Sequence, residues 1–308
     1  MKKKIDFFPL EDIVIDGQED ILSADITAII NIFDYPFSIK KNVILSSEES
    51  IEGSLGNIID NLIEEYKPYA KLPSIDVKTQ VYDLVMPSGK GGILIHEAIG
   101  HALEADNFFS DKGILFSKWK KRIADKSISI SDSPTHIEGL NFEYSADGSK
   151  TYDIQLVKDG IVEGLLSDRQ TSRLYDICNT GNGRSSSYEH QVIPRMRNTY
   201  LHNGSHSHEE IISDTKKGIY ILDIGGGQVD IKTGNFVFNV QSGCLIENGN
   251  LVSLTRPFLF KGNTLDIFDK IDMLGNNLKF QLANCSKHGQ LLPVTYGQPT
   301  LRISGHNI

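Results

Sequence analysis

The stretch that decides the fold is residues 92–104, which read GILIHEAIGHALE. A strand is expected before it at Val81–Met86, followed by a glycine-containing loop at residues 87–92 and a helix from Ile93 onward. This helix carries His96, Glu97 and His101 within a few residues of one another. Two imidazoles and a carboxylate at such close spacing indicate a metal site.

The spacing of the two histidines is one residue longer than in the HExxH zinc motif. In a regular α-helix a five-residue step turns by about 500°, which leaves the second imidazole about 140° around the helix from the first. A single-turn π-bulge would bring both imidazoles to one face, and Gly100 makes that distortion easier. Two readings follow: a zinc site on a bulged helix, or two ordinary helix histidines, one in the core and one at the surface.

Glu97 directly follows the first histidine and is the natural general base of a zinc hydrolase. Zinc lowers the pKa of a bound water to about 7, and a neighbouring carboxylate can take its proton and deliver it to the leaving amine. The alternative is a solvated glutamate on the surface of a helix.

Catalytic zinc usually has three protein ligands and an open fourth position, so one ligand is still missing. The candidates are Glu104, Asp106, Cys285 and His288. Glu104 lies one helical turn after His101 and is the local alternative. Cys285 offers a sulfur that zinc favours, although a lone cysteine is commonly a small buried apolar residue.

The rest of the chain predicts a β-rich fold. Short apolar runs separated by turns predict strands at residues 127–130, 152–157, 161–166, 219–224, 236–240, 244–247 and 251–254. Asp159-Gly160 and Asn248-Gly249 are strong hairpin signals, and helices are expected at 55–63, 209–217 and 265–273. We therefore expect an α+β fold, with a catalytic domain of antiparallel sheet at residues 81–308 on which the metal-binding helix packs, and a short α/β segment at residues 1–80.

Composition excludes several classes of protein. A net charge of −9 and a pI near 5.5 argue against nucleic acid as a partner. The sequence contains neither a signal peptide nor an apolar run long enough to cross a membrane, so a cytoplasmic protein is expected. The three cysteines are too few for a disulfide framework, and we interpret Cys178 and Cys244 as structural.

Six ordered blocks give the chain a family resemblance. The metal stretch at 92–104 is followed by blocks at 180–184 (TGNGR), 193–200 (IPRMRNTY), 225–238 (GGGQVDI and GNFVF), 245–249 (LIENG) and 297–303 (GQPTLRI). Together they resemble the TldD/PmbA family of metallopeptidases, and specifically its TldD-type subunit, which carries the HExxxH motif.

The resemblance implies a zinc metalloprotease with one Zn²⁺ per chain, bound by His96, His101 and Cys285, because a cysteine shortly before the terminal block is a ligand in this family. It also implies hydrolysis of unfolded or extended peptides, including leader-peptide removal during peptide maturation, in a homodimer or a heterodimer with a TldD/PmbA-type homologue. The chain departs from the family in two ways. Only 95 residues precede His96, so the N-terminal region is shortened, and Ser286 and His288 stand where glycine and an acidic residue are usual.

Substrate contacts are predicted at four further positions. Arg184 and His190 could grip the substrate or polarise its carbonyl, or they could be solvated turn residues. Gly226 and Gly227 could let an extended peptide approach a sheet edge, or they could form a bulge. The leading hypothesis is thus a zinc endopeptidase with Glu97 as general base. The alternative is a non-catalytic partner or peptide-binding subunit whose zinc site is structural or degenerate.

Overall fold

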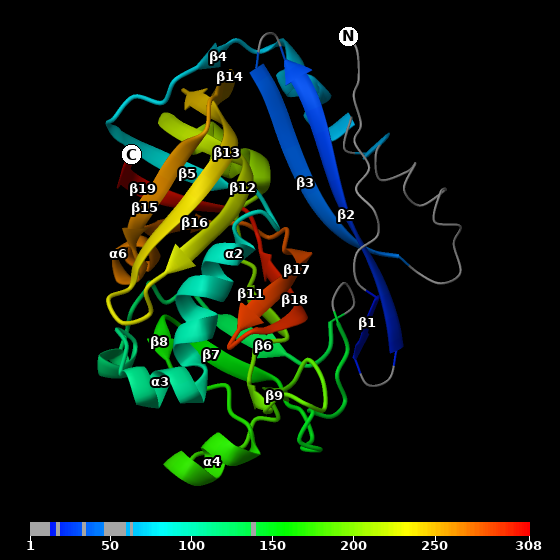
Figure 1. Ribbon diagram of the computed structural model, residues 1–308. Coiled ribbons are helices and arrows are strands. Elements are labelled where there is room, and N and C mark those ends of the chain that lie inside the picture. Colours follow the sequence, from blue (N-terminus) through cyan, green and yellow to red (C-terminus); the bar gives the residue numbers. More distant parts are fainter. Residues whose placement is uncertain (1–12, 17–18, 33–34, 46–59, 62–63, 137–139) are drawn as a thin grey trace.

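The computed structural model describes residues 13–16, 19–32, 35–45, 60–61, 64–136 and 140–308. An N-terminal antiparallel sheet of order β1-β2-β3 lies beside β17, at one side of the molecule (Figure 1). Its strands are β1 (Ile13–Asp16), β2 (Glu19–Ile32) and β3 (Tyr35–Leu45). Most of the helix predicted at residues 55–63 lies outside the described residues, and a short 3-10 helix, η1 (Lys67–Lys71), follows.

The remainder of the chain is built on two larger sheets and one small strand pair. The eight-stranded sheet has the order β16-β19-β5-β12-β13-β14-β4, with β15 paired to β13, and the six-stranded sheet has the order β17-β18-β11-β6-β7-β8. The strands of the first are β4 (Ser74–Ile75), β5 (Val81–Met86), β12 (Lys217–Val229), β13 (Asn235–Glu247), β14 (Asn250–Thr255), β15 (Phe258–Asn263), β16 (Ile271–Leu274) and β19 (Leu301–Asn307). Those of the second are β6 (Ile130–Ser133), β7 (Ile154–Lys158), β8 (Ile161–Val162), β11 (Asn198–Leu201), β17 (Lys279–Lys287) and β18 (Gln290–Gln298), and the pair is β9 (Gly183–Arg184) with β10 (Ile193–Pro194).

Three pairs of these strands are parallel, namely β5 with β12, β11 with β18 and β4 with β14, whereas the other pairs among the described strands are antiparallel. The prediction of an α+β fold with a β-rich C-terminal part is confirmed. The runs predicted separately at 236–240 and 244–247 form one strand, β13, because Gly243 continues the ladder with β12.

The helices are short. They comprise α2 (Gly92–Ile95), the π-turn η2 (His96–Gly100), η3 (His101–Leu103), α3 (Ala105–Asp111), η4 (Phe116–Lys118), α4 (Arg169–Tyr175), α5 (His208–Asp214) and α6 (Thr264–Asp269). The helix predicted at 265–273 ends at Asp269, because the chain becomes extended at Ile271 to pair with β19. Among the helices in the described part of the chain, none combines the length and apolarity needed to cross a lipid bilayer.

The hairpin predictions are confirmed. Asp159 and Gly160 have φ of 47° and 77°, and Asn248 and Gly249 have φ of 50° and 77°. Positive φ at both central residues gives the turn a twist that matches the strands on either side. His288, with φ of 50°, begins a third turn of this kind between β17 and β18. This exposed turn position is where the structure places His288, one of the candidate ligands.

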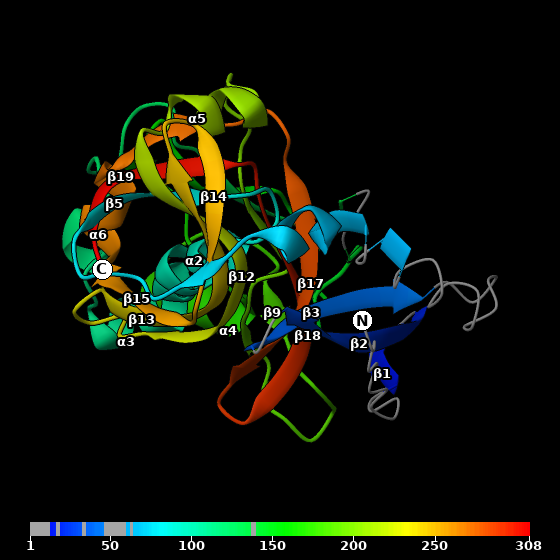
Figure 2. The ribbon, with the colours of Figure 1, turned by 90° about the horizontal axis from the view of Figure 1, so that it is seen from above.

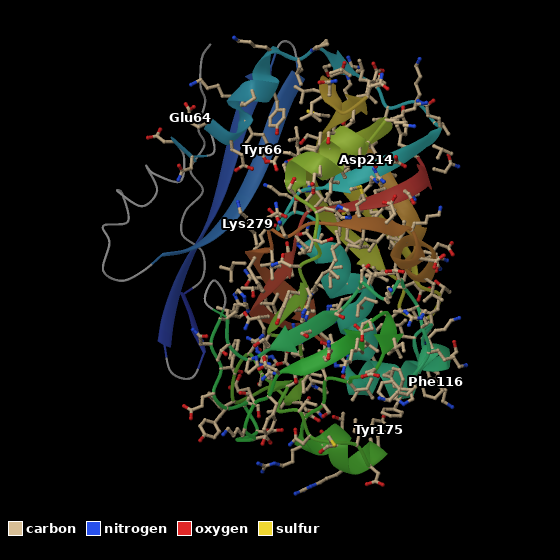
Figure 3. All side chains as sticks on the ribbon, turned by 180° about the vertical axis from the view of Figure 1, so that it is seen from behind. Glu64, Tyr66, Phe116, Tyr175, Asp214 and Lys279 are labelled. Atoms are coloured by element: carbon tan, nitrogen blue, oxygen red, sulfur yellow. The ribbon has the colours of Figure 1, made fainter. Side chains whose placement is uncertain are left out.

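The segment from α2 to η2 lies at the centre of the fold. Seen from above, strands of the eight-stranded sheet curve around it (Figure 2). Leu94, Ile95 and Ile99 are fully buried in the main apolar core, which also contains residues of β5 and β13. Each such side chain contributes about 1.5–3 kcal/mol to folding. A second, smaller core includes Tyr66 and lies at the end of the molecule near Asp214, opposite Phe116 and Tyr175 (Figure 3).

Candidate metal centre

The helix that carries the two histidines is bulged, as the zinc-site reading of its spacing required. After one turn of α-helix the backbone widens into the π-turn η2, and the N–H of His101 donates to the carbonyl of His96, five residues earlier. The two imidazole rings then lie with their centroids 4.9 Å apart. An undistorted helix would have separated them by about 140°.

Gly100 and Met196 make close contact at this bulge. A Cβ atom added to Gly100 would lie 1.8 Å from the sulfur of Met196, a side chain that is fully buried. Glycine is therefore required at position 100 because Met196 approaches so closely. Its backbone freedom also makes the helix easier to distort.

Cys285 joins the two histidines from strand β17. The ligand atoms of His96, His101 and Cys285 all lie within 4.8 Å of one another, and Cys285 Sγ is 3.2 Å from His101 Nε2. His96 Nδ1 is buried and has no hydrogen-bond partner among the described residues. Two imidazoles and a thiol, with one imidazole nitrogen left without another partner, fit a zinc ion, which prefers nitrogen and sulfur donors.

The electrostatics of Cys285 favour a thiolate. Burial raises the pKa of the Cys285 thiol, but hydrogen bonds and charge from His101 and His96 outweigh this effect and hold the pKa at about 5. Burial by itself lowers the pKa of His101, yet Glu104 and Cys285 raise it well above its ordinary value. The thiolate is the form of cysteine that binds metals, so the sulfur is in the state that coordination needs.

Glu104, the local alternative for the third ligand, lies behind His101. Its Oε2 is 2.9 Å from His101 Nδ1, the nitrogen that faces away from Cys285, and Lys287 donates to the same oxygen at 2.9 Å. Lys287 also pairs with Asp106 at 2.7 Å. Burial raises the pKa of Glu104, but Lys287 and His101 lower it to about 2, so Glu104 is ionised. A carboxylate in this position orients a metal-binding imidazole, although Oε1 of Glu104 is buried without a hydrogen-bond partner in the described part of the chain.

Comparisons with known proteins agree with a metallopeptidase site. Residues 79–308 match the family model described as the PmbA/TldA metallopeptidase C-terminal domain. The chain belongs to the TldD/PmbA family. The metalloprotease TldD homolog of Haemophilus influenzae is 32% identical over 259 residues, which cover 83% of this chain and 54% of the relative.

Two further TldD/PmbA-type proteins give a similar picture. The zinc metalloprotease TldD homolog of Saccharolobus solfataricus is 31% identical over 228 residues, covering 73% of this chain and 51% of the relative. The crystal structure of TldE from Thermococcus kodakarensis has a TM-score of 0.76 at 16% identity and covers 92% of this chain and 62% of that one, which shows a shared fold. The chain spans about half the length of the relatives it matches.

Within this TldD/PmbA fold, Glu97 and Tyr296 lie beside the histidines. Glu97 is half-buried and belongs to the same π-turn as His96, and the Tyr296 ring centroid is 6.0 Å from that of His96. Burial and then the negative charges of Glu97 and Asp223 raise the pKa of Tyr296, so its phenol stays protonated. Sequence reasoning missed Tyr296, and the signal that could have found it is its position directly before the GQPTLRI block.

The four predicted substrate contacts have different surroundings. Arg184 is buried, donates to the carbonyl of Met196 at 2.9 Å and lies over the ring of Phe142. His190 is exposed, with its Nδ1 2.8 Å from Ser187 Oγ. These placements make Arg184 part of the support of residues 193–197 and leave His190 at the surface.

The two glycines lie in β12, where its pairing with β13 is irregular. A Cβ atom on Gly226 would meet nothing within 4 Å, whereas one on Gly227 would lie 2.1 Å from the Phe238 ring. Gly226 therefore faces open space. Gly227 is required by packing.

Proposed function

We propose that the protein is a zinc-dependent metallopeptidase that hydrolyses unfolded or extended peptides in the cytoplasm, for example to remove leader peptides, with Glu97 as general base. The observation that carries this proposal is the convergence of His96, His101 and Cys285 within 4.8 Å on a bulged helix that also bears Glu97. One zinc ion per chain is expected. The proposal of a metallopeptidase is supported by relatives that are named as a metalloprotease and as a zinc metalloprotease.

The number of clustered ligands favours catalysis over a structural zinc site. In the described part of the chain this group has three members, and a catalytic site keeps its fourth position open, whereas a structural site has four protein ligands. Zinc bound by these three residues would polarise a peptide carbonyl and lower the pKa of a water molecule. Glu97 would take the proton from the attacking water and deliver it to the leaving amine.

The proposed binding place for an extended substrate is the edge of β12. This strand pairs with β5 only through Gly218–Tyr220 but continues to Val229, so that its later residues have an open edge on the β5 side among the described strands. A peptide can add to such an edge through backbone hydrogen bonds. Gly226, whose Cβ position is empty, would let the peptide lie close to the strand.

We also propose that the protein acts as a dimer, either with a second copy of itself or with a TldD/PmbA-type homologue. The proposal is supported by the chain's membership of the TldD/PmbA family and by the fold that it shares with TldE from Thermococcus kodakarensis. Size-exclusion chromatography with light scattering, and mass spectrometry of proteins that copurify from the native host, would identify the partner. A fully active monomer would contradict the proposal.

The decisive experiment compares Glu97→Gln with the wild type. Glu97→Gln should retain about one zinc per chain, measured by plasma mass spectrometry, and lose hydrolysis of an unstructured peptide. Glu143→Gln is the matched control, because Glu143 is exposed and should leave both properties unchanged. Full activity of Glu97→Gln would remove Glu97 from the mechanism, and a wild-type protein without zinc would refute the proposed function.

A further inference from the structure

The segment Pro194–Arg197 belongs to the IPRMRNTY block, which the proposed chemistry leaves without a role. It passes between the bulged helix and the hairpin that carries Cys285. Arg195 and Met196 are both fully buried, although one is charged. A buried guanidinium is costly unless its donors are satisfied. Nε of Arg195 has no hydrogen-bond partner in the described part of the chain, so the two Nη atoms carry its interactions.

The guanidinium of Arg195 holds the backbone at Cys285. Its Nη2 donates to the Cys285 carbonyl at 2.5 Å, and its Nη1 donates to the Gln290 carbonyl at 3.3 Å. These two carbonyls lie on the two strands of the β17–β18 hairpin, close to its turn. The backbone of Arg195 is itself anchored, because its N–H donates to Asn182 O and its carbonyl accepts from Asn182 Nδ2.

The residues on either side of Arg195 contact the other parts of the centre. The sulfur of Met196 fills the space beside Gly100, where the helix bulges to bring the histidines together. The carbonyl of Pro194 accepts from Lys287 at 3.2 Å, and Lys287 holds Glu104. One short segment is thus in contact with the helix and with the strand that carries the thiol, and it is linked through Lys287 to the carboxylate behind His101.

We infer that Arg195 is a positioning residue that fixes the backbone of Cys285 against the histidine helix, with Met196 as the apolar support of the bulge. This inference rests on the proposed zinc site. The guanidinium of Arg195 donates to the Cys285 carbonyl, so its effect is to hold the sulfur at the distance and direction that zinc requires. Changes to residues that orient metal ligands typically weaken metal binding by 10–100-fold.

Arg197→Met provides a matched control for Arg195→Met. Arg197 is equally buried and lies two residues away, but it donates to Asp132 at 3.2 Å and to Asn182 at 3.1 Å instead of to the Cys285 hairpin. Its loss leaves the buried Asp132 without its cation, so Arg197→Met should lower the melting temperature of the metal-free protein at least as much as Arg195→Met does.

The zinc dissociation constant, measured by competition with a chromophoric chelator, separates the two effects. We expect Arg195→Met to raise it about 10–100-fold and Arg197→Met to leave it within a few-fold of the wild type. Arg195→Lys, which keeps the charge but not the forked donor, should lie between the wild type and Arg195→Met, and it serves as the test if Arg195→Met does not fold.

Each outcome decides the inference. An unchanged zinc constant in Arg195→Met, or in Arg195→Lys if only that variant folds, would overturn the role of Arg195 and leave the zinc site intact. Equal weakening in Arg195→Met and Arg197→Met would also overturn it, because general loosening of the fold would then explain the loss. A wild-type protein that binds no zinc would instead refute the proposed function on which the inference rests.

Discussion

Gly100→Ala tests whether the bulged helix depends on a close approach by Met196. The added Cβ would lie 1.8 Å from the Met196 sulfur, with two further atoms of that side chain within 3.2 Å. Non-bonded heavy atoms are comfortable at about 3.5–4.0 Å, so the sulfur would have to retreat by roughly 2 Å. Met196 is completely buried in the main apolar core, so the displaced sulfur would press against its neighbours.

Two effects of this substitution oppose each other. Overpacking of a core costs about 1–3 kcal/mol, whereas alanine in a helix is better than glycine by about 1 kcal/mol. We therefore expect Gly100→Ala to lower the free energy of unfolding of the metal-free protein by up to about 2 kcal/mol. Zinc affinity should fall as well, because relaxing the π-turn to a regular helix would rotate His101 by about 100° relative to His96.

Equilibrium unfolding in urea and a zinc titration would measure the two changes. Gly226→Ala is the control, since its Cβ meets nothing within 4 Å, and it should stay within about 0.5 kcal/mol of the wild type. The double variant Gly100→Ala/Met196→Ala should lose about 1–2 kcal/mol less than the sum of the single variants, because the obstructing sulfur is gone. Strictly additive losses, or a Gly100→Ala protein as stable and as zinc-avid as the wild type, would refute this reasoning.

Three other predictions concern the ligands, the buried carboxylate and the substrate edge. Cys285→Ala should lose the zinc, whereas Glu104→Gln should still bind zinc at saturation, with an affinity about 10–100-fold lower. An X-ray absorption spectrum of the zinc-bound wild type with only nitrogen and oxygen donors would contradict this and indicate Glu104 as the third ligand. The metal-free protein should lose of order 3 kcal/mol of stability as the pH falls from about 4.5 to about 2, because folding lowers the pKa of Glu104 and the stabilisation by this carboxylate is fully present only above the unfolded pKa. Urea titrations of Glu104→Gln should lack this part of the acid dependence. Identical pH profiles of the variant and the wild type would contradict the assignment to Glu104. Gly226→Val should keep the urea midpoint but raise KM for extended peptides, and an unchanged KM would exclude peptide binding at this edge of β12.

Much of the local structure was predictable from the sequence because it depends on neighbours in the chain. The five-residue spacing of His96 and His101 required a π-bulge if both rings were to share one face, and the structure contains one. The turns at Asn248-Gly249 and Asp159-Gly160 follow from residues that accept positive φ. The strand at Val81–Met86 also agrees with its prediction residue for residue.

Residues distant in sequence could not be assigned in the same way. Cys285 and His101 are separated by 184 residues, and only the family resemblance favoured this cysteine over Glu104. The partners of Lys287 and Arg195 were equally invisible, because alternation along a strand predicts which side a residue faces but not which segment packs there. Both side chains look like ordinary surface cations in the sequence, yet both are buried beside the candidate metal centre.

The sequence by itself determined the five-residue spacing that requires a bulge if both histidines share one face, the position of Glu97, the β-rich class and the hairpin turns, since backbone geometry and side-chain periodicity act over a few residues. Tertiary structure alone decided that β17 carries Cys285 to His101, that Glu104 lies behind the imidazole, and that Met196 fills the space at Gly100. The physical reason is that these contacts depend on the order and registry of strands in two sheets. That order is set by the packing of the whole core, not by any one segment of the chain.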